Sequence, residues 1–187
     1  MSPPRDSSWH GAAVAILIAG PPGAQEVLFI ERAHRPLDPW SGDMAFPGGF
    51  RDPRDDDALA TAQRETLEEV GLRLPAPSRR LPWRWAFHPR DRRPLRLVPF
   101  VFHLAQRPAL DPEPTEVSAT VWIPLAHLIA ARRRQWLWIR GILPWPAPVR
   151  WWGDRRIWGL TGAMVDDLVR ALGGAGRGAH DRLDLHR

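Results

Sequence analysis

A Gly-Gly turn followed by a glutamate-rich helix sets the tightest limits on what this chain can fold into. The stretch from Phe46 to Leu72 reads FPGGFRDPRDDDALATAQRETLEEVGL. Its Pro-Gly-Gly sequence predicts a turn, and the aspartates at 55–57 are candidate N-caps. Gly71 is a natural C-terminal stop. We therefore expect one helix from about residue 58 to residue 70, entered directly from the turn.

The carboxylates of that helix share one stripe. At about 100° per residue, Glu65, Glu68 and Glu69 fall within roughly one third of the helix circumference. Four other positions recur at helical spacing and are predicted to face the core: Leu59, Ala62, Thr66 and Val70. A solvated charged face would explain three glutamates. Beside a Gly-Gly turn and an aspartate run, however, the stripe also fits Mg²⁺, which binds carboxylate oxygens together with substrate phosphates.

Strand patterns surround this helix, and two shorter helices follow it. We predict strands at Gly11–Ala19, Val27–Arg32, Met44–Phe46, Arg84–His88, Leu95–Ala105 and Val117–Ile123, and less regular ones at 136–142, 149–152 and 156–158. The first two strands are expected to form a hairpin. Helices are predicted from Pro124 to Ala131 and from an N-cap at Thr161 to Leu172, stopped by Gly173-Gly174.

Strands and helices do not alternate regularly in this pattern. That favours an α/β fold in which a mixed sheet packs between helices. The length of 187 residues suits one domain. We place it at residues 11–173, with a flexible N-terminal arm at 1–10 and a disordered tail at 174–187.

The composition excludes several kinds of chemistry. The chain has no Cys, so disulfides and thiolate sites are ruled out, and we expect a reducing cytoplasmic location. Lys and Tyr are also absent, which excludes a P-loop lysine and a Schiff base. The net charge of +5 is modest, so we expect no nucleic acid partner, whereas arginine suits a phosphate-rich small substrate. No apolar run is long enough for a membrane span, and Ala12–Ala19 is better explained as a buried strand than as a signal peptide.

The segment RETLEEVGL behind a Gly-Gly turn resembles the Nudix box. That box reads Gly, five residues, Glu, seven residues, then Arg-Glu-aliphatic-any-Glu-Glu-any-Gly-aliphatic. The resemblance implies an α/β/α Nudix sandwich that hydrolyses nucleoside diphosphates linked to another moiety, with Mg²⁺ or Mn²⁺ as cofactor. It also implies that Glu65, Glu68, Glu69 and the Gly48 carbonyl bind the metal and that Arg64 orients the glutamates.

The chain departs from the box at two positions. Thr66 stands at an aliphatic position, and the first Glu is missing. Counting forward from Gly49 puts Asp55 in its place, whereas counting back from Arg64 puts Asp56 there. The loop is therefore one residue longer than in the general box.

The longer loop is similar to that of the coenzyme A pyrophosphatase branch of the family. Upstream, Leu28–Arg32 and Gly42–Phe46 follow the outline of that branch, with Trp40-Ser41 where a His is expected. Downstream, three segments also look like it, namely Glu116-Val117, Trp122–Leu125 and Ile157–Thr161. The resemblance covers about Gly11 to Leu172 and implies hydrolysis of coenzyme A or its thioesters. The alternatives are a nucleoside triphosphate or dinucleotide pyrophosphohydrolase, and a catalytically inactive fold that binds nucleotides.

Other residues complete the list of candidates. The proton of the attacking water would go to a general base, for which we consider Glu68, Glu69 and Glu116. Three residues are expected to bind substrate: Arg32, Gly49 and Trp40. The bland alternatives are a surface ion pair for Arg32, a solvated loop for Glu116 and core packing for Trp40. Tryptophans between Trp136 and Trp152 suggest a homodimer interface.

Overall fold

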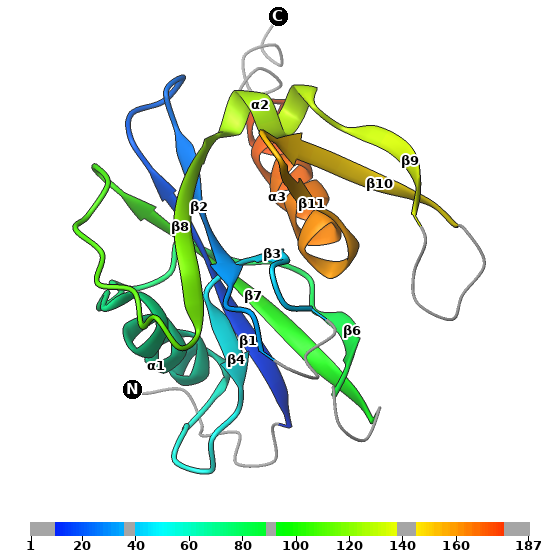
Figure 1. Ribbon diagram of the computed structural model, residues 1–187. Coiled ribbons are helices and arrows are strands. Elements are labelled where there is room, and N and C mark those ends of the chain that lie inside the picture. The colour runs from blue at the N-terminus through cyan, green and yellow to red at the C-terminus, as the bar shows by residue number, and fades with distance from the viewer. Residues whose placement is uncertain (1–9, 36–39, 89–92, 138–144, 178–187) are drawn as a thin grey trace, which may run out of the picture.

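A mixed β-sheet forms the centre of the molecule, with helices on both sides (Figure 1). The computed structural model describes residues 10–35, 40–88, 93–137 and 145–177. Within these segments the elements are β1 (Gly11–Ala19), β2 (Glu26–Arg32), β3 (Met44–Ala45), β4 (Gly48–Phe50), α1 (Ala58–Val70), β5 (Arg79–Arg80), β6 (Arg84–Phe87), β7 (Pro94–Leu104), β8 (Val117–Pro124), α2 (Leu125–Ala130), β9 (Arg133–Leu137), β10 (Trp145–Trp152), β11 (Arg155–Ile157) and α3 (Gly159–Arg177).

Strand β1 is the middle of the main sheet. It pairs in parallel with β7 from Gly11 opposite Arg96 to Ala19 opposite Leu104, and antiparallel with β2 and β4. Strands β3 and β8 pair with β2, and β5 and β6 pair with β7. The predicted hairpin and the predicted mixed sheet are both confirmed.

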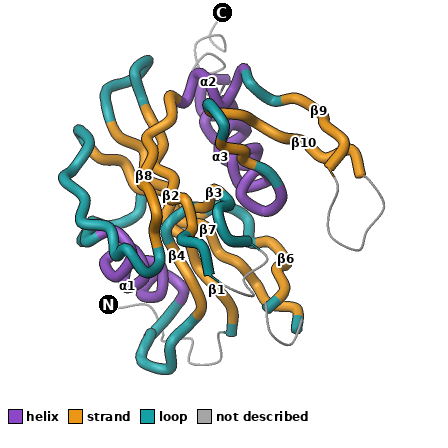
Figure 2. Tube along the Cα trace, in the orientation of Figure 1, coloured by secondary structure: helices purple, strands orange, loops and turns teal. Residues whose placement is uncertain are grey.

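Two apolar layers cover the faces of β1, which explains why its sequence is almost continuously apolar. Ala13, Ala15 and Leu17 pack with Ala62 of α1 on one face. On the other face, side chains of β1 pack with α3 through Met164, Val165 and Leu168. Figure 2 shows α1 and α3 on opposite sides of the strands. The predicted α/β/α sandwich is confirmed.

Helix α1 has the ends that its sequence predicts. Asp57 is the N-cap, and its side chain accepts a hydrogen bond of 2.8 Å from the Ala60 N–H. Gly71 ends the helix with φ 68°, and its N–H donates to the Leu67 carbonyl at 3.0 Å. Of the predicted core stripe, Ala62, Thr66 and Val70 are buried.

Two local predictions are wrong. Gly48 and Gly49 belong to β4, not to a free turn, because their backbone pairs with β1. Helix α3 begins at Gly159 without a cap at Thr161 and continues past Gly173-Gly174 to Arg177. Glycine lowers helix propensity without forbidding a helix.

The C-terminal third adds a second sheet, made of β9, β10 and β11. The predicted strand at 136–142 and the suggested interface at Trp136–Trp152 fall partly outside the described residues. The predicted arm and tail also lie largely outside them. No helix in the described segments combines the length and apolar character needed to cross a bilayer.

Candidate active site

Strand β4 and the last two turns of α1 meet at the Gly-Gly sequence. The Gly48 N–H donates a hydrogen bond of 2.8 Å to Oε2 of Glu69. Glu69 is only 4% exposed, which excludes the alternative of a fully solvated carboxylate at this position. Burial here is against the backbone of β4 and not within the apolar core, which is why apolar periodicity did not reveal it.

Close contacts surround both glycines. A Cβ at Gly49 would lie 2.4 Å from Cδ of Glu65, so that carboxylate would have to move from its present position. A Cβ at Gly48 would lie 2.3 Å from the Ala13 carbonyl oxygen, and Gly48 also has φ 147°, a region that favours glycine. The pair therefore lets two carboxylates approach the backbone of β4 closely.

Arg64 organises the acidic groups around it. Its Nη1 lies 2.9 Å from Oε1 of Glu65 and 2.8 Å from Oε2 of Glu68. Its Nη2 donates to the Phe50 carbonyl at 2.9 Å, which ties α1 to the end of β4. These contacts agree with the predicted role of Arg64 as the residue that orients the glutamates.

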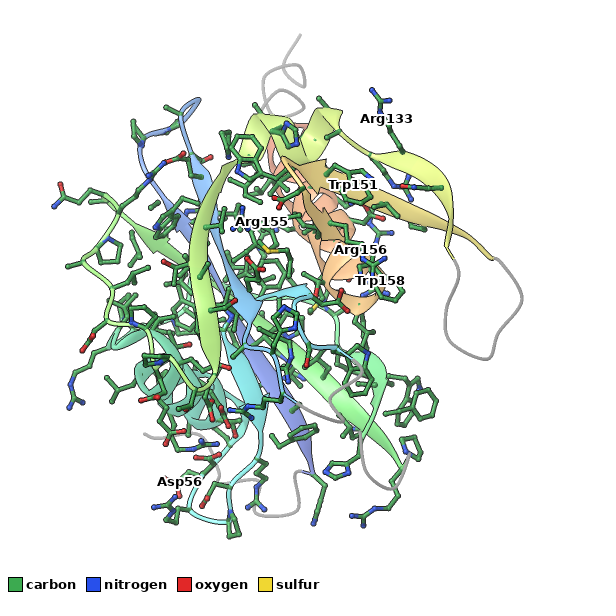
Figure 3. All side chains as sticks on the ribbon, in the orientation of Figure 1. Asp56, Arg133, Trp151, Arg155, Arg156 and Trp158 are labelled. Carbon is green, nitrogen blue, oxygen red and sulfur yellow. The ribbon has the colours of Figure 1, made fainter. Side chains whose placement is uncertain are left out.

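Of the two candidates for the place of the missing Glu, Asp55 is the one that contacts Arg64. Its carboxylate accepts hydrogen bonds from Nε and Nη2 of Arg64 at 2.9 and 3.0 Å, and from Oγ1 of Thr61 at 2.7 Å. Burial raises the pKa of Asp55, but hydrogen bonds from Arg64, the Asp52 N–H and Thr61 outweigh it, so the pKa is lowered. Asp56 is exposed, and Figure 3 shows it at the periphery of the molecule. The contact with Arg64 favours the forward count from Gly49, and the assignment of Asp55 stays a prediction.

The remaining carboxylates repel one another. Burial raises the pKa of Glu69 to about 8; the Gly48 N–H and Arg32 lower it, while the charges of Glu65 and Glu116 raise it. Burial also raises the pKa of Glu65, against the opposing effect of Arg64, and Glu68 and Glu116 add to the rise. The site thus concentrates negative charge at a position that is partly shielded from solvent.

Glu116, in the loop before β8, is near enough for its charge to raise the pKa of Glu65 and Glu69. The Glu113 N–H donates to the Glu69 carbonyl and the Asp111 N–H to the Val70 carbonyl, each at 3.0 Å. These bonds hold the loop against the C-terminal end of α1. No local sequence pattern could show this, because more than forty residues separate the bonded partners.

Most of the predicted site residues lie together, but two differ. Glu68 is turned toward Arg64 and its side chain is 52% exposed. Trp40 lies in a turn in which its carbonyl accepts from the Asp43 N–H at 3.1 Å, and its role in binding stays a prediction. Sequence analysis did not predict the contact at Asp43. Its carboxylate accepts a 3.0 Å hydrogen bond from Nε1 of Trp158.

The donor set suits a hard divalent cation. Carboxylate oxygens are the ligands that Mg²⁺ and Mn²⁺ prefer. Burial is the main cause of the raised pKa of Glu69 and Glu65, and a cation would relieve the repulsion from neighbouring carboxylates that adds to it. In the described segments no group of three or more acidic or histidine side chains is arranged so that it could hold a metal ion. Glu65 and Glu68 contact Arg64, and Glu69 contacts Gly48. The assignment of individual ligands therefore stays a prediction.

Known proteins resemble this chain over most of its length. The model of the NUDIX domain matches residues 9–146. The human mitochondrial coenzyme A diphosphatase NUDT8 is 31% identical over 163 residues, which cover 86% of this chain and 69% of that protein. An uncharacterized Nudix hydrolase, NudL of Yersinia enterocolitica, is 32% identical over 165 residues, 87% of this chain and 82% of that one.

The fold has counterparts among solved structures. A C. elegans Ap4A hydrolase has a TM-score of 0.54 at 17% sequence identity, covering 88% of this chain and 98% of that one. At this level of identity the likeness concerns the fold alone.

Proposed function

The chain belongs to the NUDIX domain family and is a pyrophosphohydrolase, and from this premise we propose that it cleaves the pyrophosphate linkage of coenzyme A or its thioesters. The observation that carries the hydrolase site is the crowding of Glu65, Glu69 and Glu116 beside the Gly-Gly strand. The substrate class rests on similarity to a coenzyme A diphosphatase along 86% of the chain. It also rests on the longer loop that brings Asp55 to Arg64.

We propose that the site binds Mg²⁺ or Mn²⁺ through Glu65, Glu68, Glu69 and the Gly48 carbonyl. The ion would neutralise the charge that develops on the diphosphate and lower the pKa of attacking water. In the present conformation Glu68 contacts Arg64, so its participation would require that side chain to turn.

The protein's own groups supply orientation and proton transfer. Arg64 holds Glu65 and Glu68 in place and is itself fixed by Asp55. We assign Arg32 and Gly49 to contacts with substrate phosphate, and Trp40 to stacking on the adenine base. Glu116 is our first choice for the group that accepts the proton of the attacking water, with Glu68 and Glu69 as alternatives.

The partners, the cellular location and the oligomeric state of the enzyme remain predictions. We retain a small-molecule nucleotide as its partner and expect no nucleic acid or membrane partner. A cytoplasmic location remains our prediction from the absence of cysteine. A homodimer also remains a prediction, since part of the relevant tryptophan segment lies outside the described residues.

A substrate panel tests the proposal directly. The protein would be incubated with Mg²⁺ or Mn²⁺ and coenzyme A, acetyl-coenzyme A, ADP-ribose, NADH or a nucleoside triphosphate. The proposal predicts the highest kcat/KM for coenzyme A or its thioester. Preference for another nucleotide would favour the alternative pyrophosphohydrolase, for which Trp40 in place of the expected His is the motivating observation. No turnover of any member would indicate the inactive nucleotide-binding fold.

A further inference from the structure

The Arg35 side chain makes hydrogen bonds to the end of the loop that carries Glu116. Its Nε and Nη2 donate to the Thr115 carbonyl at 3.0 and 2.8 Å, and the same Nη2 lies 3.1 Å from Oε1 of Glu116. One planar guanidinium thus holds both the backbone before Glu116 and the Glu116 carboxylate. This contact fixes the direction of the Glu116 side chain and places a positive charge beside its carboxylate.

The backbone on either side is held equally firmly. The Ala33 N–H donates to the Glu116 carbonyl at 2.9 Å, and the Glu116 N–H donates to the Glu113 carbonyl at 3.0 Å. Glu113 in turn donates its N–H to the Glu69 carbonyl. Hydrogen bonds therefore tie residues 113–116 to Glu69 at the end of α1 and to Ala33, two residues before Arg35.

The Ser41 hydroxyl holds the backbone of Arg35 through two hydrogen bonds. The Arg35 N–H donates to Oγ of Ser41, and that hydroxyl donates to the Arg35 carbonyl, each at 3.0 Å. The two bonds hold the backbone of the residue whose side chain contacts Glu116. An ordinary solvent-facing ion pair would not need its backbone to be held in this way.

We propose that Arg35 is a positioning residue that holds the Glu116 carboxylate toward the reacting water. The inference rests on the proposed function, in which Glu116 accepts a proton. Glu116 lies in the negative field of Glu65 and Glu69, which repels it. The Arg35 guanidinium counters that repulsion and also restricts the rotamers of the glutamate. Both groups are partly exposed, at 47% and 41%, so the pair contributes little to folding stability and its effect should appear in turnover.

A double-mutant cycle in kcat tests this. The cycle would use Arg35→Ala, Glu116→Gln and the double variant, on whichever panel nucleotide the wild type hydrolyses best. We expect Glu116→Gln to lower kcat by about 100-fold or more and Arg35→Ala by about tenfold or more, with KM nearly unchanged. The double variant should be no slower than Glu116→Gln, because Arg35 acts only through Glu116. Arg35→Lys, which keeps the charge without the fork, should recover part of the lost kcat.

Arg107→Ala is the matched control. Arg107 also binds a carboxylate through two nitrogens, that of Glu26, and it is similarly exposed at 52%. It lies by the other end of β2, so its loss should leave kcat unchanged. Multiplicative losses in the double variant, or wild-type kcat in Glu116→Gln, would overturn the inference while leaving hydrolysis of coenzyme A intact. Absence of turnover on every nucleotide would instead overturn the proposed function, and the inference with it.

Discussion

The carboxylate of Asp55 and the guanidinium of Arg64 form a two-pronged ion pair, with Nε to Oδ1 at 2.9 Å and Nη2 to Oδ2 at 3.0 Å. Asp55 is 5% exposed, so the pair lies in a mostly dry environment. Arg64 uses its remaining nitrogen on Glu65 and Glu68. Asp55 thus sets the direction of Arg64, the arginine that we propose orients the metal ligands.

Replacing Asp55 should therefore damage both stability and activity. Asp55→Asn leaves the inner face of Arg64 without its charge partner, and we expect the free energy of unfolding to fall by about 2–4 kcal/mol. Chemical denaturation would measure this, with kcat determined in parallel. Asp56→Asn, at the exposed neighbouring position, should stay within about 0.5 kcal/mol of wild type. Equal losses in the two variants would contradict the assignment of Asp55.

Gly49→Ala should abolish turnover because its Cβ would overlap the Glu65 carboxylate, 2.4 Å from Cδ. We expect kcat to fall by at least about 100-fold as Glu65 is displaced. Gly173→Ala is the matched control, since nothing lies within 4 Å of a Cβ there. That variant should keep full activity and gain up to about 1 kcal/mol from improved helix propensity. Wild-type kcat in Gly49→Ala would contradict the requirement that the Glu65 carboxylate keep its present position.

Without divalent ions, the protein should become less stable as pH rises from about 5 to 8. The pKa of Glu69 is about 8 in the folded protein against an ordinary 4.5, so between these values the folded state binds more protons than the unfolded state. The free energy of unfolding then falls as pH increases. Thermal unfolding in EDTA should show a Tm that declines across this range and a weaker decline in Glu69→Gln. The same slope in both proteins would show that another group is responsible.

Trp158 should affect substrate binding through Asp43. Its indole N–H donates to Asp43, and Arg156 lies 3.6 Å from the same carboxylate, so residues of the C-terminal third hold the segment that leads into β3 (Figure 3). Trp158→Phe should cost about 1 kcal/mol of stability and raise KM more than it lowers kcat.

Trp151→Phe is its control, because the Trp151 indole donates to Gln135 within the second sheet. That variant should leave KM unchanged. A rise in KM of equal size would show that the effect comes from general loosening of the C-terminal third.

Local signals account for what could be predicted. Asp57 and Gly71 define both ends of α1 because capping is decided by a few adjacent residues. The spacing of Arg64 and Glu68 likewise predicts their i, i+4 contact, which is present at 2.8 Å. Strand β1 could be predicted from the sequence because burial on both faces requires a continuous apolar run.

The missed features depend on segments far apart in the sequence. Gly48–Phe50 becomes a strand only because β1 is available to pair with it. The contact between Arg35 and Glu116 joins positions 81 residues apart, and the bond from Trp158 to Asp43 joins positions 115 residues apart. Neither pair belongs to any periodic pattern. The burial of Glu69 against β4 was not predicted, because helical periodicity cannot show that a glycine strand covers this carboxylate.

Hydrolysis of coenzyme A in ¹⁸O-labelled water tests the central claim most directly. With Mg²⁺ or Mn²⁺, wild-type protein should produce adenosine 3′,5′-bisphosphate and phosphopantetheine, one of which carries a single ¹⁸O atom in mass spectra. EDTA should abolish the products, and Glu69→Gln should lower their rate of formation by at least about 100-fold. Intact coenzyme A after prolonged incubation would contradict the account, as would equal product formation by Glu69→Gln and wild type.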